Sequence, residues 1–114
     1  MTVLSQAALG RATLARQLLL TPSDREPIDV IKHLLGLQAQ AQLPPYFGLW
    51  CRLRDFAPAQ LAQLIIGRSV VRVALMRSTV HLATAADARM LRPLLQPALA
   101  RMFNATMSGR ALAT

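Results

Sequence analysis

A pair of glutamines, Gln38 and Gln40, is the most suggestive chemical feature of this 114-residue sequence. A glutamine amide offers one carbonyl acceptor and two N–H donors, so it can orient a water molecule, although it is a poor base. Two such residues at positions i and i+2 would point apart in a regular helix. Gly36 and the Pro44–Pro45 pair interrupt helical structure on either side, which permits an irregular site where both amides hold one water. The alternative is that Gln38, Gln40 and Gln42 are exposed polar residues at a helix end.

The two histidines offer a second kind of chemistry. His81 follows Thr79 in a predicted hairpin, where it could meet a phosphate or place a proton near a reacting group, with a structural role as the alternative. His33 stands beside Lys32 and is interpreted as a surface residue. Two distant histidines without a carboxylate or cysteine partner make a poor metal site. The sequence also lacks paired carboxylates and a glycine-rich phosphate loop, so we expect neither a metal nor an organic cofactor.

The charge of the chain is strongly positive, with 13 basic and 5 acidic residues and a formal net charge of +8. All the basic residues except Lys32 are arginines, whose forked guanidinium suits phosphate. A basic excess of this size favours a polyanionic partner, most commonly nucleic acid, and a solvated basic surface is the alternative. The candidate phosphate contacts lie in or near the hairpin and at the end of the third predicted helix. They are Arg52, Arg54, Arg68, Arg72, Arg77 and Thr79.

Composition limits the class of protein. Apolar residues make up 54% of the chain, which excludes disorder, and the length predicts one domain. The single cysteine, Cys51, excludes an internal disulfide framework and a multi-cysteine zinc site. No apolar run approaches the roughly 18–20 residues of a membrane helix, and no signal peptide is apparent. The expected compartment is the cytoplasm.

Helical spacing of apolar residues, together with capping signals, predicts four helices before residue 68. Ser5 caps the first, Pro27 suits the first turn of the second, and Pro58 starts the fourth. The expected ranges are about 6–19, 27–35, 46–54 and 58–67. The residues expected to face the core are Leu9, Ala12, Ala15, Leu19, Ile28, Ile31, Leu34, Leu35, Phe47, Trp50, Leu53, Leu61, Leu64 and Ile65.

The pattern then changes to a period of two. The valine-rich stretch 69–76 predicts a strand and 79–83 a returning strand, although Arg77-Ser78 between them is a weak turn signal. Thr84 and Asp87 fit a capping box for a last long helix, which Pro93 and Pro97 must kink or split. The pair Ser108–Gly109 is expected to break that helix, and 110–114 looks like the beginning of another element. The expected fold class is mainly α with a short β-hairpin, a winged helix-turn-helix, with the third helix as the candidate recognition helix.

Three blocks of this sequence resemble the winged-helix DNA glycosylases of the AlkZ/YcaQ type. The blocks are Leu35–Gln40 followed by Pro45–Trp50, then Leu75–Leu82, then Leu91–Pro97. They occur in the family's order and spacing, and the similarity covers nearly the whole chain. Members of this family are bacterial enzymes that remove alkylated purines from DNA, and some unhook interstrand crosslinks.

The resemblance implies a catalytic role for Gln38 and Gln40, because the family signature is a glutamine, an aliphatic residue, then glutamine or aspartate. A purine alkylated at N7 or N3 is already cationic, so it departs without prior protonation. The protein then has to position a water and stabilise an oxocarbenium-like sugar. His81 is the third candidate catalytic residue.

The resemblance also implies how the chain is organised. Residues 1–83 would form a first winged-helix module, and 84–114 a helix leading into an incomplete second one. Family chains are several times longer, so this chain would be an N-terminal fragment. The expected partners are double-stranded, alkylated DNA and the missing C-terminal winged-helix modules. The alternatives are a non-enzymatic winged-helix DNA-binding protein and an inactive fragment.

Overall fold

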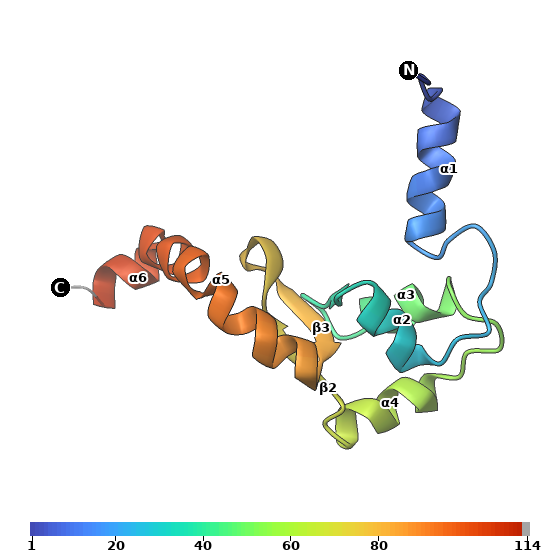
Figure 1. The fold of residues 1–114 in the computed structure, drawn as a ribbon. Helices are drawn as coiled ribbons and strands as arrows, with labels where there is room; N and C mark the ends of the chain where they lie inside the picture. The colour runs from blue at the N-terminus through green and yellow to red at the C-terminus, as the bar shows by residue number, and fades with distance from the viewer. Residues whose placement is uncertain (113–114) are drawn as a thin grey trace.

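The computed structural model describes residues 1–112 and is rich in helix, with one small antiparallel sheet (Figure 1). The helices are α1 (Gln6–Arg16), α2 (Pro27–His33), α3 (Pro44–Trp50), α4 (Pro58–Ile66), α5 (Ala85–Ala105) and α6 (Met107–Leu112). The strands are β1 (Leu37–Gln38), β2 (Val70–Ala74) and β3 (Val80–Thr84), and a 3₁₀ turn, η1 (Met76–Ser78), joins β2 to β3. The predicted helices, the hairpin and the Ser5 cap are confirmed, with ends shifted by a few residues.

The sheet has three strands in the order β1-β3-β2, where the sequence predicted only two. Leu37 pairs with Leu82 and Gln38 with His81, while Arg72 pairs with Leu82 and Val73 with His81. Because directly opposite residues share a face, Leu37, Leu82 and Arg72 lie on one side of the sheet. Gln38, His81 and Val73 lie on the other.

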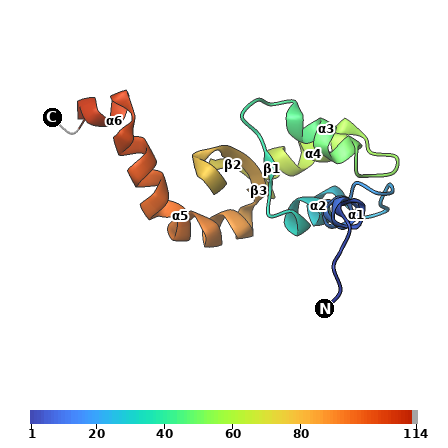
Figure 2. The ribbon, with the colours of Figure 1, turned by 90° about the horizontal axis from the view of Figure 1, so that it is seen from above.

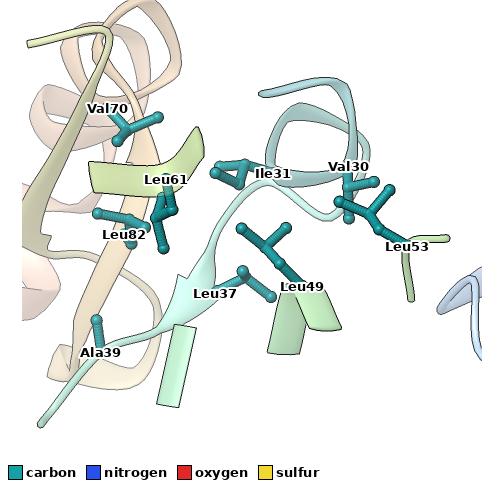
Figure 3. Close-up of a cluster of buried hydrophobic side chains, with 9 residues drawn as sticks. All are labelled: Val30, Ile31, Leu37, Ala39, Leu49, Leu53, Leu61, Val70 and Leu82. Atoms are coloured by element: carbon teal, nitrogen blue, oxygen red, sulfur yellow. The ribbon is translucent and has the colours of Figure 1, made fainter. Parts of the chain in front are cut away.

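The main hydrophobic core fills the space between the first of these faces and helices α2, α3 and α4 (Figure 3). It consists of Val30, Ile31, Leu37, Ala39, Leu49, Leu53, Leu61, Val70 and Leu82. The first half of α5 covers the opposite face, where Leu75, Ala83 and Ala88 form a second buried cluster. The β1 strand is thus held between the main core and β3.

The turn between α2 and β1 sets the position of the glutamine pair. Helix α2 ends in a Schellman motif, in which Gly36 N–H donates to the Ile31 carbonyl and Leu35 N–H to the Lys32 carbonyl. Leu35 is left-handed (φ 58°), and Gly36 has a φ of 130° that disfavours any side chain. A Cβ on Gly36 would lie 3.1 Å from the Leu82 carbonyl oxygen. This glycine therefore lets β1 approach β3.

Helix α5 begins at the predicted Thr84 cap, whose hydroxyl accepts from Asp87 N–H. It contains Pro93 and Pro97 and continues through them, with a change of direction that Figure 2 shows. The helix ends at Ala105, with Thr106 as its C-cap, so the predicted break at Ser108–Gly109 is wrong, because Gly109 lies within α6. The predicted element over 110–114 falls within α6 as far as residue 112, and its last two positions lie outside the described residues.

The molecule is extended. Its radius of gyration is 17.0 Å, against about 13 Å expected for a compact domain of this length. Helix α1 stands apart from the other helices (Figure 1) and buries none of its residues, so its predicted core stripe is wrong. Hydrogen bonds to residues distant in the sequence join its C-terminal end to the rest of the chain: His33 Nε2 lies 2.9 Å from the Arg16 carbonyl, and Arg52 donates to the Gln17 carbonyl at 2.7 Å and to Gln17 Oε1 at 3.4 Å.

Helix α3 turns a different face to the core than the sequence predicted. Leu49 is fully buried, whereas Phe47 and Trp50 are 63% and 67% exposed. These two rings border an open apolar hollow of about 400 Å³. It is lined by Leu43, Tyr46, Phe47, Trp50, Phe56 and Pro58. Val30 of α2 is fully buried, whereas Leu35, which was expected to face the core, lies in the turn after α2 and is 45% exposed.

Candidate functional site

The sheet brings together Gln38 and His81, which are far apart in the sequence. They are directly opposite each other in the β1–β3 register. The neighbouring Ala39 N–H donates to the Val80 carbonyl at 2.8 Å, so the Gln38–His81 position is a non-hydrogen-bonded pair. In such pairs the two side chains approach most closely. The irregular backbone expected around the first glutamine is therefore a short strand instead.

The His81 ring is almost entirely buried, with 5% exposure. Its Nδ1 lies 3.0 Å from the Thr79 carbonyl oxygen, and since that oxygen can only accept, Nδ1 carries the proton and donates. In this tautomer Nε2 is left as an acceptor. Among the described residues, every fully buried side-chain nitrogen or oxygen has a hydrogen-bond partner. Since Nε2 of His81 has no such partner, it is not fully buried and reaches the surface. The buried ring thus presents one acceptor on the face of the sheet that also carries Gln38.

The two glutamines are held differently. Gln40 Oε1 accepts from Val80 N–H at 3.1 Å, which fixes the amide and leaves its NH₂ group as the free end. The Gln38 side chain is exposed and makes no hydrogen bond within the part of the chain that the structure describes. Gln38 is therefore the amide free to hold a water by its carbonyl, whereas the Gln40 carbonyl is already used.

Several of the predicted phosphate contacts are engaged within the protein. Arg52 donates to the carbonyls of Gln17 and Gly48, and Arg54 forms an exposed ion pair of 2.9 Å with Asp24. These contacts join α1 and the loop before α2 to the segment that follows α3.

Arg72 is engaged as well. Its Nη2 and Nε donate to the Ala39 carbonyl oxygen at 2.7 and 3.3 Å. The carbonyl belongs to the residue between the two glutamines, a connection that the sequence pattern did not indicate.

The remaining candidates lie around the hairpin. Arg68 precedes β2 and Arg77 stands at the hairpin tip, and both are exposed, without a side-chain partner among residues 1–112. Thr79 is half-buried, and its hydroxyl donates to the Met76 carbonyl at 3.1 Å. Arg68 and Arg77 are thus the arginines of the predicted set that are free to meet a phosphate.

Within residues 1–112, no group of three His, Cys, Asp or Glu side chains is placed to hold a metal ion. None of the described helices is long and apolar enough to cross a membrane.

A family model described as "DNA glycosylase AlkZ-like" matches residues 31–113, which is most of the chain and includes the glutamine pair and the hairpin. The chain belongs to the AlkZ-like DNA glycosylase family. No curated protein matches it. Among solved structures, the DNA glycosylase AlkZ of Streptomyces sahachiroi is similar, with a TM-score of 0.65 and 22% sequence identity over 83% of this chain. At that identity the likeness supports the fold, and the chain covers 28% of the length of that protein.

Proposed function

We propose that this AlkZ-like chain binds double-stranded, alkylated DNA as a winged-helix module and hydrolyses the N-glycosidic bond of an alkylated purine. The observation that carries the proposal is the pairing of Gln38 with His81 on one sheet face, within a chain of the AlkZ-like family. The chain spans about a quarter of the Streptomyces glycosylase. We therefore propose that further winged-helix modules complete the DNA channel. The proposed compartment is the cytoplasm.

The order of elements supports a winged helix over residues 27–84. Helix α2 is followed by β1, helices α3 and α4, and then the β2–β3 hairpin, with β1 on the outer side of β3. In this arrangement α3 and α4 form the helix-turn-helix and the hairpin forms the wing. Arg52 and Arg54, which pointed to the third helix as the recognition helix, are engaged elsewhere. Helix α4 exposes Gln63 and precedes the wing directly, which makes it the better candidate.

The geometry supports a simple hydrolysis. A water held between the Gln38 carbonyl and His81 Nε2 has two acceptors that direct its oxygen outward, toward the sugar C1′. As the C1′–N bond breaks, its electron pair neutralises the cationic base. The water oxygen adds to C1′, and its proton passes to Nε2 and then to solvent. The products are the free alkylpurine and an abasic site, and no acid is needed for the leaving base.

The proposal is tested by single-turnover release of 7-methylguanine from duplex DNA by the chain joined to the further winged-helix modules. We expect Gln38→Ala to lower the saturated rate by roughly thirtyfold to a thousandfold, the effect of losing one preorganised polar contact worth about 2–4 kcal/mol. Gln42→Ala removes the same exposed amide two residues beyond the motif and should change nothing. The wild-type chain and both variants should bind DNA with equal affinity, since neither glutamine side chain carries charge.

Gln40 allows a finer test. Gln40→Glu keeps an oxygen for Val80 N–H and adds a negative charge that can stabilise an oxocarbenium ion, so it should retain activity that Gln40→Ala loses. Wild-type rates in both Gln38→Ala and Gln40→Ala would show that the motif is not catalytic. Salt-dependent DNA binding without any base release would support the non-enzymatic DNA-binding function instead.

A further inference from the structure

The side chain of Arg72 reaches from β2 across the central strand to the end of β1. Arg72 pairs with Leu82 on β3, and Ala39 lies beyond β3 on the far side of the sheet. Two donors of the guanidinium meet the single Ala39 carbonyl oxygen, at 2.7 and 3.3 Å. An arginine from one outer strand thus holds the backbone of the other outer strand, at the residue between Gln38 and Gln40.

The contact from Arg72 to the Ala39 carbonyl replaces a backbone hydrogen bond of the β1–β3 pairing, the one from Val80 N–H. In an antiparallel hydrogen-bonded pair the two residues exchange both N–H···O bonds. Here Ala39 N–H donates to the Val80 carbonyl, but Val80 N–H donates to Gln40 Oε1 at 3.1 Å instead of to Ala39. The Ala39 carbonyl goes to Arg72. By occupying that carbonyl, the guanidinium leaves the Val80 N–H free for the Gln40 side chain.

We propose that Arg72 is a positioning residue, which sets both glutamines through the Ala39 carbonyl, and that it does not act as a phosphate contact. Without Arg72, the Ala39 carbonyl would take the Val80 N–H and the Gln40 amide would be displaced. The β1 backbone between the two glutamines would shift with it. The planar fork of arginine is needed for two donors on one oxygen, which lysine does not provide. This inference rests on the proposed function of the glutamine pair.

The charge-conserving variant Arg72→Lys separates positioning from phosphate contact. A lysine would keep most of a phosphate contact but lose the fork on Ala39. We expect Arg72→Lys to lower the saturated single-turnover rate by about 100-fold, the effect of a misplacement of about 1 Å, with less than about a twofold change in Kd. Arg11→Lys, the matched control on the exposed helix α1, should leave both quantities unchanged.

The salt dependence of DNA binding gives a second readout. A direct phosphate contact contributes about −0.9 to the slope of log affinity against log salt. Arg72→Gln should therefore leave the slope as it is in the wild-type chain, whereas Arg77→Gln should make it shallower by about 0.9. A loss of slope in Arg72→Gln, with a wild-type excision rate in Arg72→Lys, would overturn the proposal.

A spectroscopic readout keeps the inference separate from catalysis. In the wild-type chain, nuclear Overhauser effects should join the Gln40 side-chain amide to Val80 N–H, and Arg72 Nε–H should exchange with solvent more slowly than Arg77 Nε–H. The Gln40–Val80 effect should vanish in Arg72→Lys. If it does so in a chain that releases no base, the positioning stands and the proposed function fails. Equal exchange of the two Nε–H groups in the wild-type chain refutes the positioning even if the variants do not fold.

Discussion

The tip of the β2–β3 hairpin is made by two consecutive residues in the left-handed conformation, Arg77 (φ 53°) and Ser78 (φ 56°). Thr79 N–H donates to the Met76 carbonyl at 3.2 Å, which closes the four-residue turn. Positive φ at both central positions defines the type I′ turn, which favours Asn-Gly. Each side chain held in this region costs roughly 1–2 kcal/mol. We predict that Arg77→Asn together with Ser78→Gly stabilises the chain.

Positions 77 and 78 each contribute to the expected gain in the free energy of unfolding. Ser78→Gly relieves the strain but frees the unfolded backbone, which costs about 0.5–1 kcal/mol, so its net gain is about 0.5–1 kcal/mol. Asparagine tolerates the left-handed region and adds a similar amount at position 77. The double variant should therefore gain about 1–2 kcal/mol and melt about 4–8 °C higher, for a domain of roughly a hundred residues. Thermal unfolding followed by circular dichroism measures this directly.

The same substitutions should separate stability from DNA binding. Arg77→Asn removes the proposed phosphate contact and should make the salt slope shallower by about 0.9, whereas Ser78→Gly should leave the slope unchanged. Arg11→Gln removes an equal charge from α1, away from the hairpin, and should not alter the slope. Unchanged melting in both hairpin variants would refute the strain argument. An unchanged slope in Arg77→Asn would show that the hairpin tip does not touch DNA.

Three further predictions concern the framework around the site. Gly36→Ala should lower the free energy of unfolding by about 1–3 kcal/mol, because Gly36 has a positive φ and lies close to the Leu82 carbonyl of β3. Gly10→Ala is the control in the exposed helix α1, where the new Cβ meets no other atom, and it should be neutral or stabilising by up to about 1 kcal/mol. Leu49→Ala, at a fully buried position, should cost about 2–5 kcal/mol in a denaturant titration. Phe47→Ser with Trp50→Ser should reduce self-association and the binding of a dye specific for exposed apolar surface, without a matching loss of stability, because both rings are largely exposed. Dye binding equal to that of the wild-type chain would contradict this last prediction.

The sequence predicted those elements whose signals are local. Pro27 and Pro58 mark the first turns of α2 and α4, and Thr84 caps α5, because each effect involves only the adjacent turn. Alternating valines predicted the hairpin for the same reason. Strand β1 carried no such signal, since two residues cannot show a period. Its existence depends on pairing with β3 much later in the chain.

Burial was harder to predict than secondary structure. Phe47 and Trp50 are large and apolar, and helical spacing alone does not tell which side of α3 meets the core. The core takes Leu49 instead, which belongs to the same buried cluster as Leu37 of β1. The candidate site was likewise predicted only in part. The resemblance to a family indicated the glutamine pair, but the link from Arg72 to Ala39 requires the three-strand order, which no local pattern encodes.

The shortness of β1 gives the glutamine pair a stability of its own. Gln38 stands on a two-residue strand at the sheet's outer edge, which Leu37 and Ala39 anchor in the main core, whereas the two strands of the hairpin pair with each other over five residues. Regions held by few contacts open locally with a smaller free energy than global unfolding requires. Opening of β1 would therefore separate Gln38 from His81, while Arg68 and Arg77 would stay in place around the hairpin. Such a chain would pass between a binding-only state and a hydrolysis-ready state, and a substrate that contacts both glutamines would shift this equilibrium toward the second.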